Sequence, residues 1–372
     1  MSASETRRRP VATGLSHGHG AQFDHAELAV KQALKRAGLT RANGIILFLT
    51  PDYASEPEPA LRAAARAGGC TQVIGCTGAG VLTDSEWVLD SPGVAAMVFG
   101  GNIQLKMAPT KYDTEEPVLS FCTPSGMTAD WLDVPAPRLG AVSGDLFGHG
   151  PFRVWSGSRV ADSGHVDCVL SGAQGTVAAS QGVQALTSPI EVAEVQGYDV
   201  MKLSQYPALN VLVKSLPEEI KEQKHIPFHL IMGGITFGDP DTAIKEGRYR
   251  LNHIVSANLS DKSITLASPP HQGERLFWAM RDALSAERAM AQTIMKAQQT
   301  LGTEPDFALL FPCMGRGPHF FGNRDRDLEL LKSRFPGLPI LGFYGNGEIG
   351  PLDGMNHLYQ YSAILGLFNI AA

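Results

Sequence analysis

The sequence predicts an α/β protein of mixed α+β type, with two domains that each hold a mixed β-sheet, flanking helices and glycine-rich loops at strand ends. Short apolar runs alternate with segments of helical periodicity, and several of these runs lead directly into clusters of glycine. The 372 residues also exceed the usual size of a single domain. The predicted boundaries are a disordered tail over 1–24, a first domain over 25–219 and a second domain over 220–372.

The C-terminal part carries the clearest signal, a strand, a helix and a strand that form a crossover unit. Apolar strands are predicted at 307–311 and 339–343, with a helix over 325–334 between them. Strands joined in this way run parallel and end at one edge of the sheet. Ligands of open α/β sheets usually lie beyond the carboxyl ends of the strands, so we expect a binding site in the two loops that follow.

Those two loops carry Cys313, Arg316 and Glu348, which we expect to converge. Arg316 lies between two glycines, which leave its planar guanidinium free to bind the carboxylate of a ligand or of Glu348. An arginine and a glutamate across one pocket would suit a zwitterion. A nearby arginine would lower the thiol pKa of Cys313 and favour reactivity, whereas the commoner alternative is a buried, inert cysteine.

The N-terminal half repeats this arrangement of strand, helix, strand and glycine loop. Residues 73–82 align without gaps on 340–349, with three glycines in register, so an internal duplication is our hypothesis. Cys76 and the glycines around it, Gly78 among them, would then form a nest of backbone N–H groups for an anion. The elements predicted here are helices over 25–37 and 60–67 and strands over 44–50 and 71–74.

The middle of the chain contains consecutive strands without helices between them, so the sheets are predicted to be mixed. A strand pair is expected around Gly100-Gly101, a dipeptide typical of hairpins. The predicted elements are hairpins of 93–99 with 103–107 and of 248–255 with 263–267, strands at 166–170, 175–179 and 190–195, and helices over 202–216 and 274–301.

Composition excludes several classes of function. The net charge is −6 and Lys and Arg are not concentrated, which argues against a nucleic-acid partner. No run reaches the roughly 18 apolar residues of a membrane-spanning helix, and the N-terminal segment lacks the apolar stretch of a secretion signal. Five scattered cysteines without paired spacing are typical of a reduced, cytoplasmic chain.

Three motifs taken together resemble the C-terminal domain of the FIST family. They are Arg281-Asp282-Ala-Leu-Ser-Ala286, Phe311-x-Cys313-x-Gly315-Arg316-Gly317, and Gly342-Phe343-x-x-x-Gly347-Glu348-Ile349-Gly350-Pro351. Residues 74–80 and Tyr206-Pro-Ala-Leu209 resemble the N-terminal domain of that family. The sequence departs from the family pattern in 343–347, which lacks a cysteine, and at Val183, where relatives often place one.

The resemblance implies a stand-alone, bacterial-type sensory protein of signal transduction that binds a small polar metabolite, such as an amino acid, without transforming it. Its partners would be that small ligand and a signalling protein. One alternative is a haem-based gas sensor, although the sequence nominates no histidine as axial ligand. The other is an enzyme with Cys313 as nucleophile or Glu348 as general base, which would require a base within hydrogen-bond reach.

The candidate site is therefore one of ligand binding, and we predict no catalytic residue, no metal ligand and no cofactor other than the haem of that alternative. Arg281 and Asp282 are adjacent on a predicted helix and point about 100° apart, so at most one of them would face the site squarely. The predicted ligand-binding residues are Arg316, Glu348, Cys313, Gly315, Gly317, Asn346, Gly347, Cys76, Gly78, Ser143, Gly144, Arg281 and Asp282.

Overall fold

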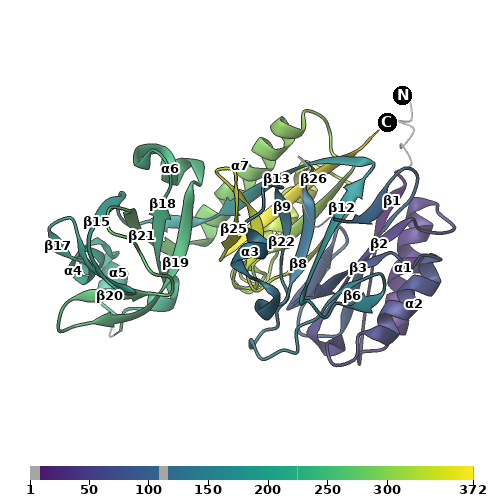
Figure 1. Cartoon of the computed structure of the whole chain (residues 1–372), viewed down its shortest axis with the longest axis horizontal. Coiled ribbons are helices and arrows are strands. Elements are labelled where there is room, and N and C mark those ends of the chain that lie inside the picture. Colours follow the sequence, from purple (N-terminus) through teal and green to yellow (C-terminus); the bar gives the residue numbers. More distant parts are fainter. Residues whose placement is uncertain (1–8, 109–115, 224, 372) are drawn as a thin grey trace. The chain divides into compact units, whose positions relative to one another are not determined.

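The computed structural model describes residues 9–108, 116–223 and 225–371 (Figure 1). Contacts within the chain define two units. Unit 1 comprises Met1–Ser180 with Met290–Ala372, and unit 2 comprises Gln181–Ala289. Helices and several mixed sheets confirm the predicted fold class. The predicted division between residues 219 and 220 refers to family domains and stays a prediction.

Sheet A of unit 1 has a strand from the N-terminal segment at its edge. Val11–His17 (β1) pairs antiparallel with Gly93–Phe99 (β6) along its whole length. The predicted disordered tail is therefore wrong for this stretch, and residues 1–8 of that prediction lie outside the described residues. The strand order is β1, β6, β2 (Gly44–Leu49), β3 (Val73–Thr77), β10 (Val154–Ser156) and β11 (Arg159–Val160).

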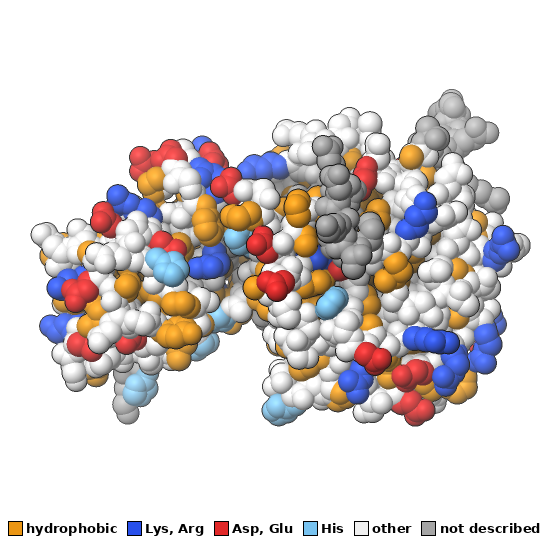
Figure 2. Space-filling view, in the orientation of Figure 1, with side chains coloured by type: hydrophobic (Ala, Val, Ile, Leu, Met, Phe, Trp, Pro, Cys, Tyr) orange, Lys and Arg blue, Asp and Glu red, His pale blue; other side chains and the backbone are white. Residues whose placement is uncertain are grey.

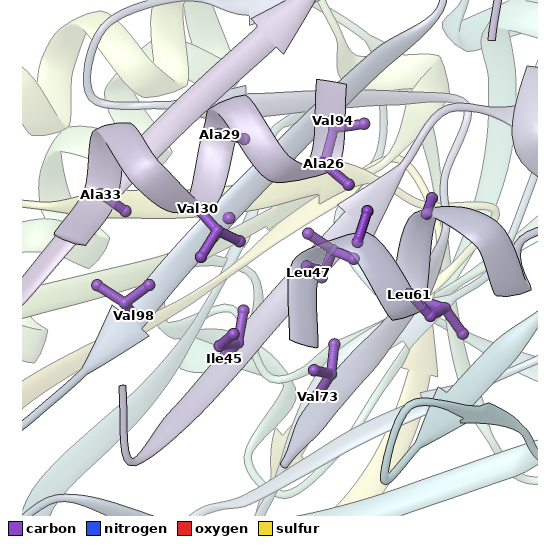
Figure 3. Packing of buried hydrophobic residues seen from close by; sticks show 14 of the residues in the cluster. Ala26, Ala29, Val30, Ala33, Ile45, Leu47, Leu61, Val73, Val94 and Val98 are labelled. Atoms are coloured by element: carbon purple, nitrogen blue, oxygen red, sulfur yellow. The ribbon is translucent and has the colours of Figure 1, made fainter. Parts of the chain in front are cut away.

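The two helices predicted over 25–37 and 60–67 are present and cover one face of sheet A. Asp24–Ala37 (α1) and Glu58–Gly68 (α2) present small apolar side chains to the sheet (Figure 3). The contact is close, because a Cβ at Gly14 of β1 would lie 1.9 Å from the carbonyl oxygen of Ala29. Only glycine leaves room there, which explains why a strand with so few large apolar residues is still buried. The labelled residues of this core are Ala26, Ala29, Val30, Ala33, Ile45, Leu47, Leu61, Val73, Val94 and Val98.

Unit 1 contains two further sheets. Helix α8 (Arg326–Arg334) and the part of α7 (Ala283–Leu301) that lies in unit 1 pack on sheet B through apolar side chains such as Met290 and Leu331. Sheet B has the order β13 (Ala173–Gln181), β26 (Ser362–Ile370), β22 (Phe307–Pro312), β23 (Ile340–Tyr344), β4 (Gly80–Thr83), β5 (Trp87–Val88). Sheet C has the order β25 (Met355–Tyr359), β24 (Glu348–Leu352), β9 (Arg138–Val142), β8 (Val118–Cys122), β12 (His165–Ser171), β7 (Gln104–Met107).

Each sheet of unit 1 holds a pair of parallel strands: β2 with β3, β8 with β9, and β22 with β23. Each pair contains one glycine at the same register. A Cβ at Gly75, Gly140 or Gly342 would lie 1.9, 1.8 or 1.7 Å from a carbonyl oxygen of the partner strand. The segments 73–82 and 340–349 thus share local structure, as hypothesised, and a third copy lies around Gly140. A short 3₁₀ helix follows the first strand of each pair: η1 (Pro51–Tyr53), η2 (Pro124–Gly126) and η4 (Met314–Arg316).

The three strand pairs are linked in a cycle. The strand that follows each pair joins the next sheet, so that β4 pairs with β23, β24 with β9, and β10 with β3. Phe48, Phe121 and Phe311, from the first strand of each pair, meet in the interior with ring centroids 5.2, 5.7 and 5.9 Å apart. Nearly equal distances indicate an approximate threefold arrangement around these rings.

Unit 2 is built on a sheet that closes on itself. Its strands follow the order β14 (Val183–Ala185), β21 (Arg275–Arg281), β15 (Ile190–Gln196), β16 (Asp199–Leu203), β20 (Ser263–Leu266), β19 (Tyr249–Asn258) and β18 (Ile231–Thr236), and β18 pairs again with β21. Strand β17 (Tyr206–Pro207) pairs with β16. The shorter helices of the chain are α3 (Ala129–Leu132) in unit 1, and α4 (Ala208–Ser215), α5 (Glu218–Lys221), α6 (Pro240–Glu246) and η3 (Phe228–Leu230) in unit 2.

The structure corrects three predicted elements. The helix predicted over 274–301 begins only at Ala283, because Arg275–Arg281 is strand β21 between β18 and β15. The helix predicted over 202–216 is shortened in the same way to Ala208–Ser215. The hairpin predicted at Gly100-Gly101 is wrong, because β6 pairs with β1 and β2 while β7 pairs with β12. The hairpin of β19 and β20 is confirmed.

Candidate functional site

The loops after β3, β9 and β23 are fixed by equivalent backbone hydrogen bonds. The N–H groups of Gly78, Ser143 and Gly345 donate to Leu49, Cys122 and Pro312 at 2.9, 2.7 and 2.9 Å. In the first loop the N–H groups of Thr77 and Ala79 also donate to protein carbonyls. The amides of the predicted anion nest around Cys76 are therefore engaged by the protein itself.

Cys76, in strand β3, and Ser143, in the loop after β9, are both buried. The hydroxyl groups of Thr77 and Ser143 lie 2.7 Å apart, which joins the first two loops. Burial, followed by the proximity of Cys122, raises the pKa of the Cys76 thiol well above its ordinary value. Gly144 lies against Asn346 of the third loop, so Ser143, Gly144 and Asn346 meet as neighbours.

Arg316 is 1% exposed, and its guanidinium is fully occupied by protein groups. Its Nε and Nη2 donate to the two carboxylate oxygens of Asp327 at 2.8 and 2.9 Å. Its Nη1 and Nη2 also donate to the carbonyl and hydroxyl oxygens of Ser180 at 2.9 and 2.8 Å. The carboxylate expected from a ligand or Glu348 is thus supplied by Asp327, which the sequence analysis did not single out.

A second buried carboxylate lies beside this pair. Asp325 begins helix α8, accepting the N–H of Leu328 at 2.9 Å, and it also accepts the hydroxyl of Tyr344. Burial and then the negative charge of Asp327 raise the pKa of Asp325 to about 6. The spacing Asp-x-Asp at a predicted helix start is the sequence signal that would have pointed to both acids.

Glu348 is buried beside Cys313 and Ser362. Its Oε2 accepts a hydrogen bond from the hydroxyl of Ser362 at 2.7 Å, whereas no hydrogen bond to its Oε1 is found among the described residues. Burial raises the pKa of Glu348 to about 8, although Ser362, Cys313 and Arg316 each lower it somewhat. Burial and then the charge of Glu348 raise the pKa of the Cys313 thiol. Cys313, Arg316 and Glu348 therefore interact as expected, but in the interior of unit 1.

The remaining predicted residues have backbone or capping roles. The N–H of Gly317 donates to Met314, that of Asn346 donates to Val142, and the carbonyl of Gly347 accepts the N–H of Val142. Gly347 has φ +118°, a conformation that favours glycine. The N–H of Gly315 donates a hydrogen bond to the sulfur of Cys313, which partly offsets the rise in the pKa of that thiol. In unit 2, Arg281 ends β21, and Asp282 accepts the N–H of Ser285 at 2.7 Å and so caps α7.

A cavity of about 230 Å³ lies at the carboxyl ends of β2 and β3. Ligands of open α/β sheets usually bind in this position. The loop after β3 contributes Ala79, and the loop after β9 contributes Asp145, next to the predicted Ser143-Gly144. Its described lining contains three carboxylates and no Lys or Arg. We call it the acidic pocket, and its lining residues are Thr50, Pro51, Asp52, Ala79, Asp90, Ser91, Asp145, Leu146 and Phe147.

Each carboxylate of the acidic pocket has a hydrogen-bond or ion-pair partner in the protein. Asp145 accepts backbone N–H groups of residues 147–150. Burial alone would raise its pKa, but these hydrogen bonds outweigh burial and lower it, so Asp145 is ionised at neutral pH. Asp52 accepts the hydroxyl of Thr50 at 2.8 Å, and the carboxylate of Asp90 lies 3.5 Å from the imidazole Nε2 of His319. The pocket thus combines fixed negative charge with an apolar wall of Leu146 and Phe147.

Residues 43–205 match the FIST N domain, and residues 208–351 match the FIST C domain. The chain belongs to the FIST family. FIST domains are generally sensory, small-ligand-binding domains of signal transduction. All residues that line the acidic pocket lie within the FIST N domain.

Two proteins similar to this chain are named only as uncharacterized proteins. The uncharacterized protein Mb0898c of Mycobacterium bovis is 28% identical over 67% of this chain, and the alignment spans 65% of that relative's length. The uncharacterized protein MT0656 of Mycobacterium tuberculosis is 23% identical over 96% of this chain and 99% of its own length. Both FIST domains contribute strands to unit 1, since β2 and β3 lie in FIST N and β22 and β23 in FIST C.

Among residues 9–108, 116–223 and 225–371, no group of three His, Cys, Asp or Glu side chains is arranged to hold a metal ion. Neither the acidic pocket nor the larger cavities of about 570, 620 and 930 Å³ has a histidine in its described lining. Within the same ranges, no helix combines the length and apolar character needed to span a bilayer.

Proposed function

We propose that this chain is a sensory protein whose FIST N domain binds a small polar metabolite with a protonated amine, such as an amino acid, in the acidic pocket. The observation that supports this most is the position of the pocket. It lies beyond the carboxyl ends of two parallel strands and is bordered by the loops that carry Ala79 and Asp145.

Size and charge favour such a ligand. A cavity of about 230 Å³ is smaller than the roughly 300–1,000 Å³ typical of drug-sized ligands, and so suits a single amino acid or amine. Asp52, Asp90 and Asp145 would bind the ammonium group by charge-assisted hydrogen bonds, which are stronger than neutral ones. Phe147 is 79% exposed at the rim and would cover the apolar part of the ligand.

The interior cluster around Glu348 supports a binding role over a catalytic one. A nucleophilic cysteine must be a thiolate with access to substrate, whereas Cys313 is buried and its pKa is raised. Arg316 has its donors directed to Asp327 and Ser180. These residues stabilise the loops, and the ligand is bound elsewhere.

A thermal-shift panel tests the proposal, because a ligand that binds only the folded state raises the unfolding midpoint. Wild-type protein is screened with amino acids, amines and matched metabolites that lack an amine. We expect amine-bearing compounds alone to raise the midpoint, and the double variant Asp52→Asn with Asp90→Asn to lose that shift. Asp133→Asn, an exposed acid outside the pocket, should retain it. An equal shift in the double variant would contradict this site.

The signalling partner and the haem alternative are tested separately. Haem titration followed by visible absorption would reveal a bound haem as a shifted Soret band. On the present proposal, no saturable shift is expected at stoichiometric haem. A partner would be sought by comparing pull-downs with and without the ligand that the panel identifies.

A further inference from the structure

A second cavity of unit 1, of about 930 Å³, is lined by four arginines. Arg62 and Arg66 come from α2, Arg153 precedes β10, and Arg159 begins β11. Glu58 and Asp162 are the acidic residues of the lining, so its formal charge is positive in a chain of net charge −6. In Figure 2, Lys and Arg side chains gather with acidic ones at the lower right, below the place of α2 in Figure 1.

The four guanidinium groups are not neutralised by close partners. In the described part of the chain, none of them lies within the 4 Å of a carboxylate that defines an ion pair. Arg66 acts at longer range on Glu27, whose pKa is lowered mainly by Lys31 and to a smaller extent by Arg66. Arg62 and Arg66 are four residues apart on α2, a spacing at which like charges destabilise a helix. An anion in the cavity would relieve this repulsion.

The cavity is built on rigid elements. Gly157 and Ser158 make the turn between β10 and β11 with φ of +57° and +65°. The hydroxyl of Ser158 donates to the carbonyl of Thr71 at 2.9 Å and so ties the turn to the segment before β3. Arg159 follows this turn and lines the cavity together with the arginines of α2, and Ser55 and Thr71 add hydroxyl groups to the lining.

We propose that this cavity binds a small organic molecule with two or more phosphate groups. Guanidinium groups bind phosphate bidentately, and several of them around one concavity match a ligand with several negative charges. The volume lies near the upper end of the range for small-molecule and cofactor sites, and Pro57, Ala65 and Val160 offer apolar surface to an organic moiety. The four arginines line one cavity in a chain of net charge −6, which favours a small ligand over a nucleic acid.

Isothermal titration calorimetry at physiological ionic strength tests this with adenosine 5′-triphosphate and pyrophosphate as probes. We expect both to bind the wild-type protein with a Kd below about 1 mM, and adenosine 5′-triphosphate more tightly if the organic moiety contributes. The double variant Arg62→Gln with Arg159→Gln should bind at least tenfold more weakly. Arg288→Gln removes an exposed arginine from unit 2 and should bind as wild type does.

Two outcomes would overturn the proposal. One is the absence of measurable heat with both probes at millimolar concentration. The other is equal affinity in the wild type and the Arg62/Arg159 double variant, which would place binding elsewhere. Because both side chains are exposed, the variants should keep the wild-type unfolding midpoint, and Arg66→Gln provides an independent third substitution. Neither probe carries the protonated amine that the acidic pocket is proposed to bind. Failure of this experiment would therefore leave the proposed sensory function untouched.

Discussion

Arg316 and Asp327 form a two-point ion pair in the interior of unit 1, with both guanidinium–carboxylate hydrogen bonds below 3 Å and neither side chain more than 1% exposed. The same guanidinium holds Ser180, the last residue of unit 1 before the chain enters unit 2. Arg316 thus joins η4, helix α8 and the end of β13. Its role in the structure is to fix these three segments.

The first prediction concerns this ion pair. Arg316→Ala should lower the free energy of unfolding by about 3–5 kcal/mol, because it leaves the carboxylate of Asp327 buried without a partner. The double variant Arg316→Met with Asp327→Leu should recover most of that loss, since an apolar pair of similar volume is often tolerated. Urea unfolding measures both, and Arg324→Ala, at an exposed ion pair, should have little effect. A mild effect of Arg316→Ala would show that the pair is not buried as described.

The second prediction concerns pH. The pKa of Glu348 is about 8 in the folded state, against an ordinary value of 4.5. The folded state therefore holds this proton more tightly, so its stabilising contribution is complete below pH 4.5 and is lost as pH rises to about 8. Glu348→Gln should flatten the fall in unfolding free energy between pH 5 and pH 8.5. An unchanged pH profile in this variant would contradict a buried, protonated Glu348.

The third prediction concerns thiol reactivity. Cys70 is the one cysteine of intermediate exposure, whereas Cys76, Cys122, Cys168 and Cys313 are buried. A mild electrophile at pH 7.5 should label Cys70 first, and the buried cysteines only at the rate of unfolding. Mass spectrometry of time-resolved digests measures the order. Rapid labelling of Cys313 in the native protein would revive the enzymatic alternative.

The fourth prediction concerns the repeated glycines. Gly140→Ala should destabilise the protein by about 1–3 kcal/mol or more, because its Cβ would overlap the carbonyl oxygen of Ser120 at 1.8 Å. Gly342→Ala should behave similarly against Leu310. Gly233→Ala in unit 2 is the control, since its Cβ would meet ordinary contacts of 3.4 Å or more. Equal stability of all three variants would argue against the close strand contacts described at Gly140 and Gly342.

Elements that depend on local pattern could be predicted from sequence. Helix α1, strand β2 and the β22–α8–β23 crossover follow from apolar periodicity and helix-ending glycines, which need no knowledge of distant residues. Strand β21 could not be predicted in this way. The spacing of Leu276 and Met280 is compatible with a helix, and only the pairing with β18 and β15 makes the segment a strand. The third strand pair, β8 with β9, could not be predicted, because its sequence resembles the other two in little more than Gly140 and the following Ser-Gly loop.

The candidate site was predictable only in part, because some of its contacts follow from local pattern and others join residues that are far apart in the sequence. The meeting of Cys313, Arg316 and Glu348 follows from strand order alone. Whether that meeting point is open or sealed depends on Ser180, which is 136 residues away from Arg316 in sequence. The acidic pocket takes Asp52 from η1 and Asp90 from a loop, neither of which carries a motif, so only the folded chain reveals them as neighbours.

Hydrogen–deuterium exchange in the presence of the amine-bearing ligand from the thermal-shift panel tests the binding claim most directly. The account predicts slower exchange at the described segments of the acidic pocket, around Asp52, Ala79, Asp90 and Phe147, and no change around Arg316 and Glu348. Protection confined to other segments, or a panel in which no amine-bearing compound binds, would contradict it.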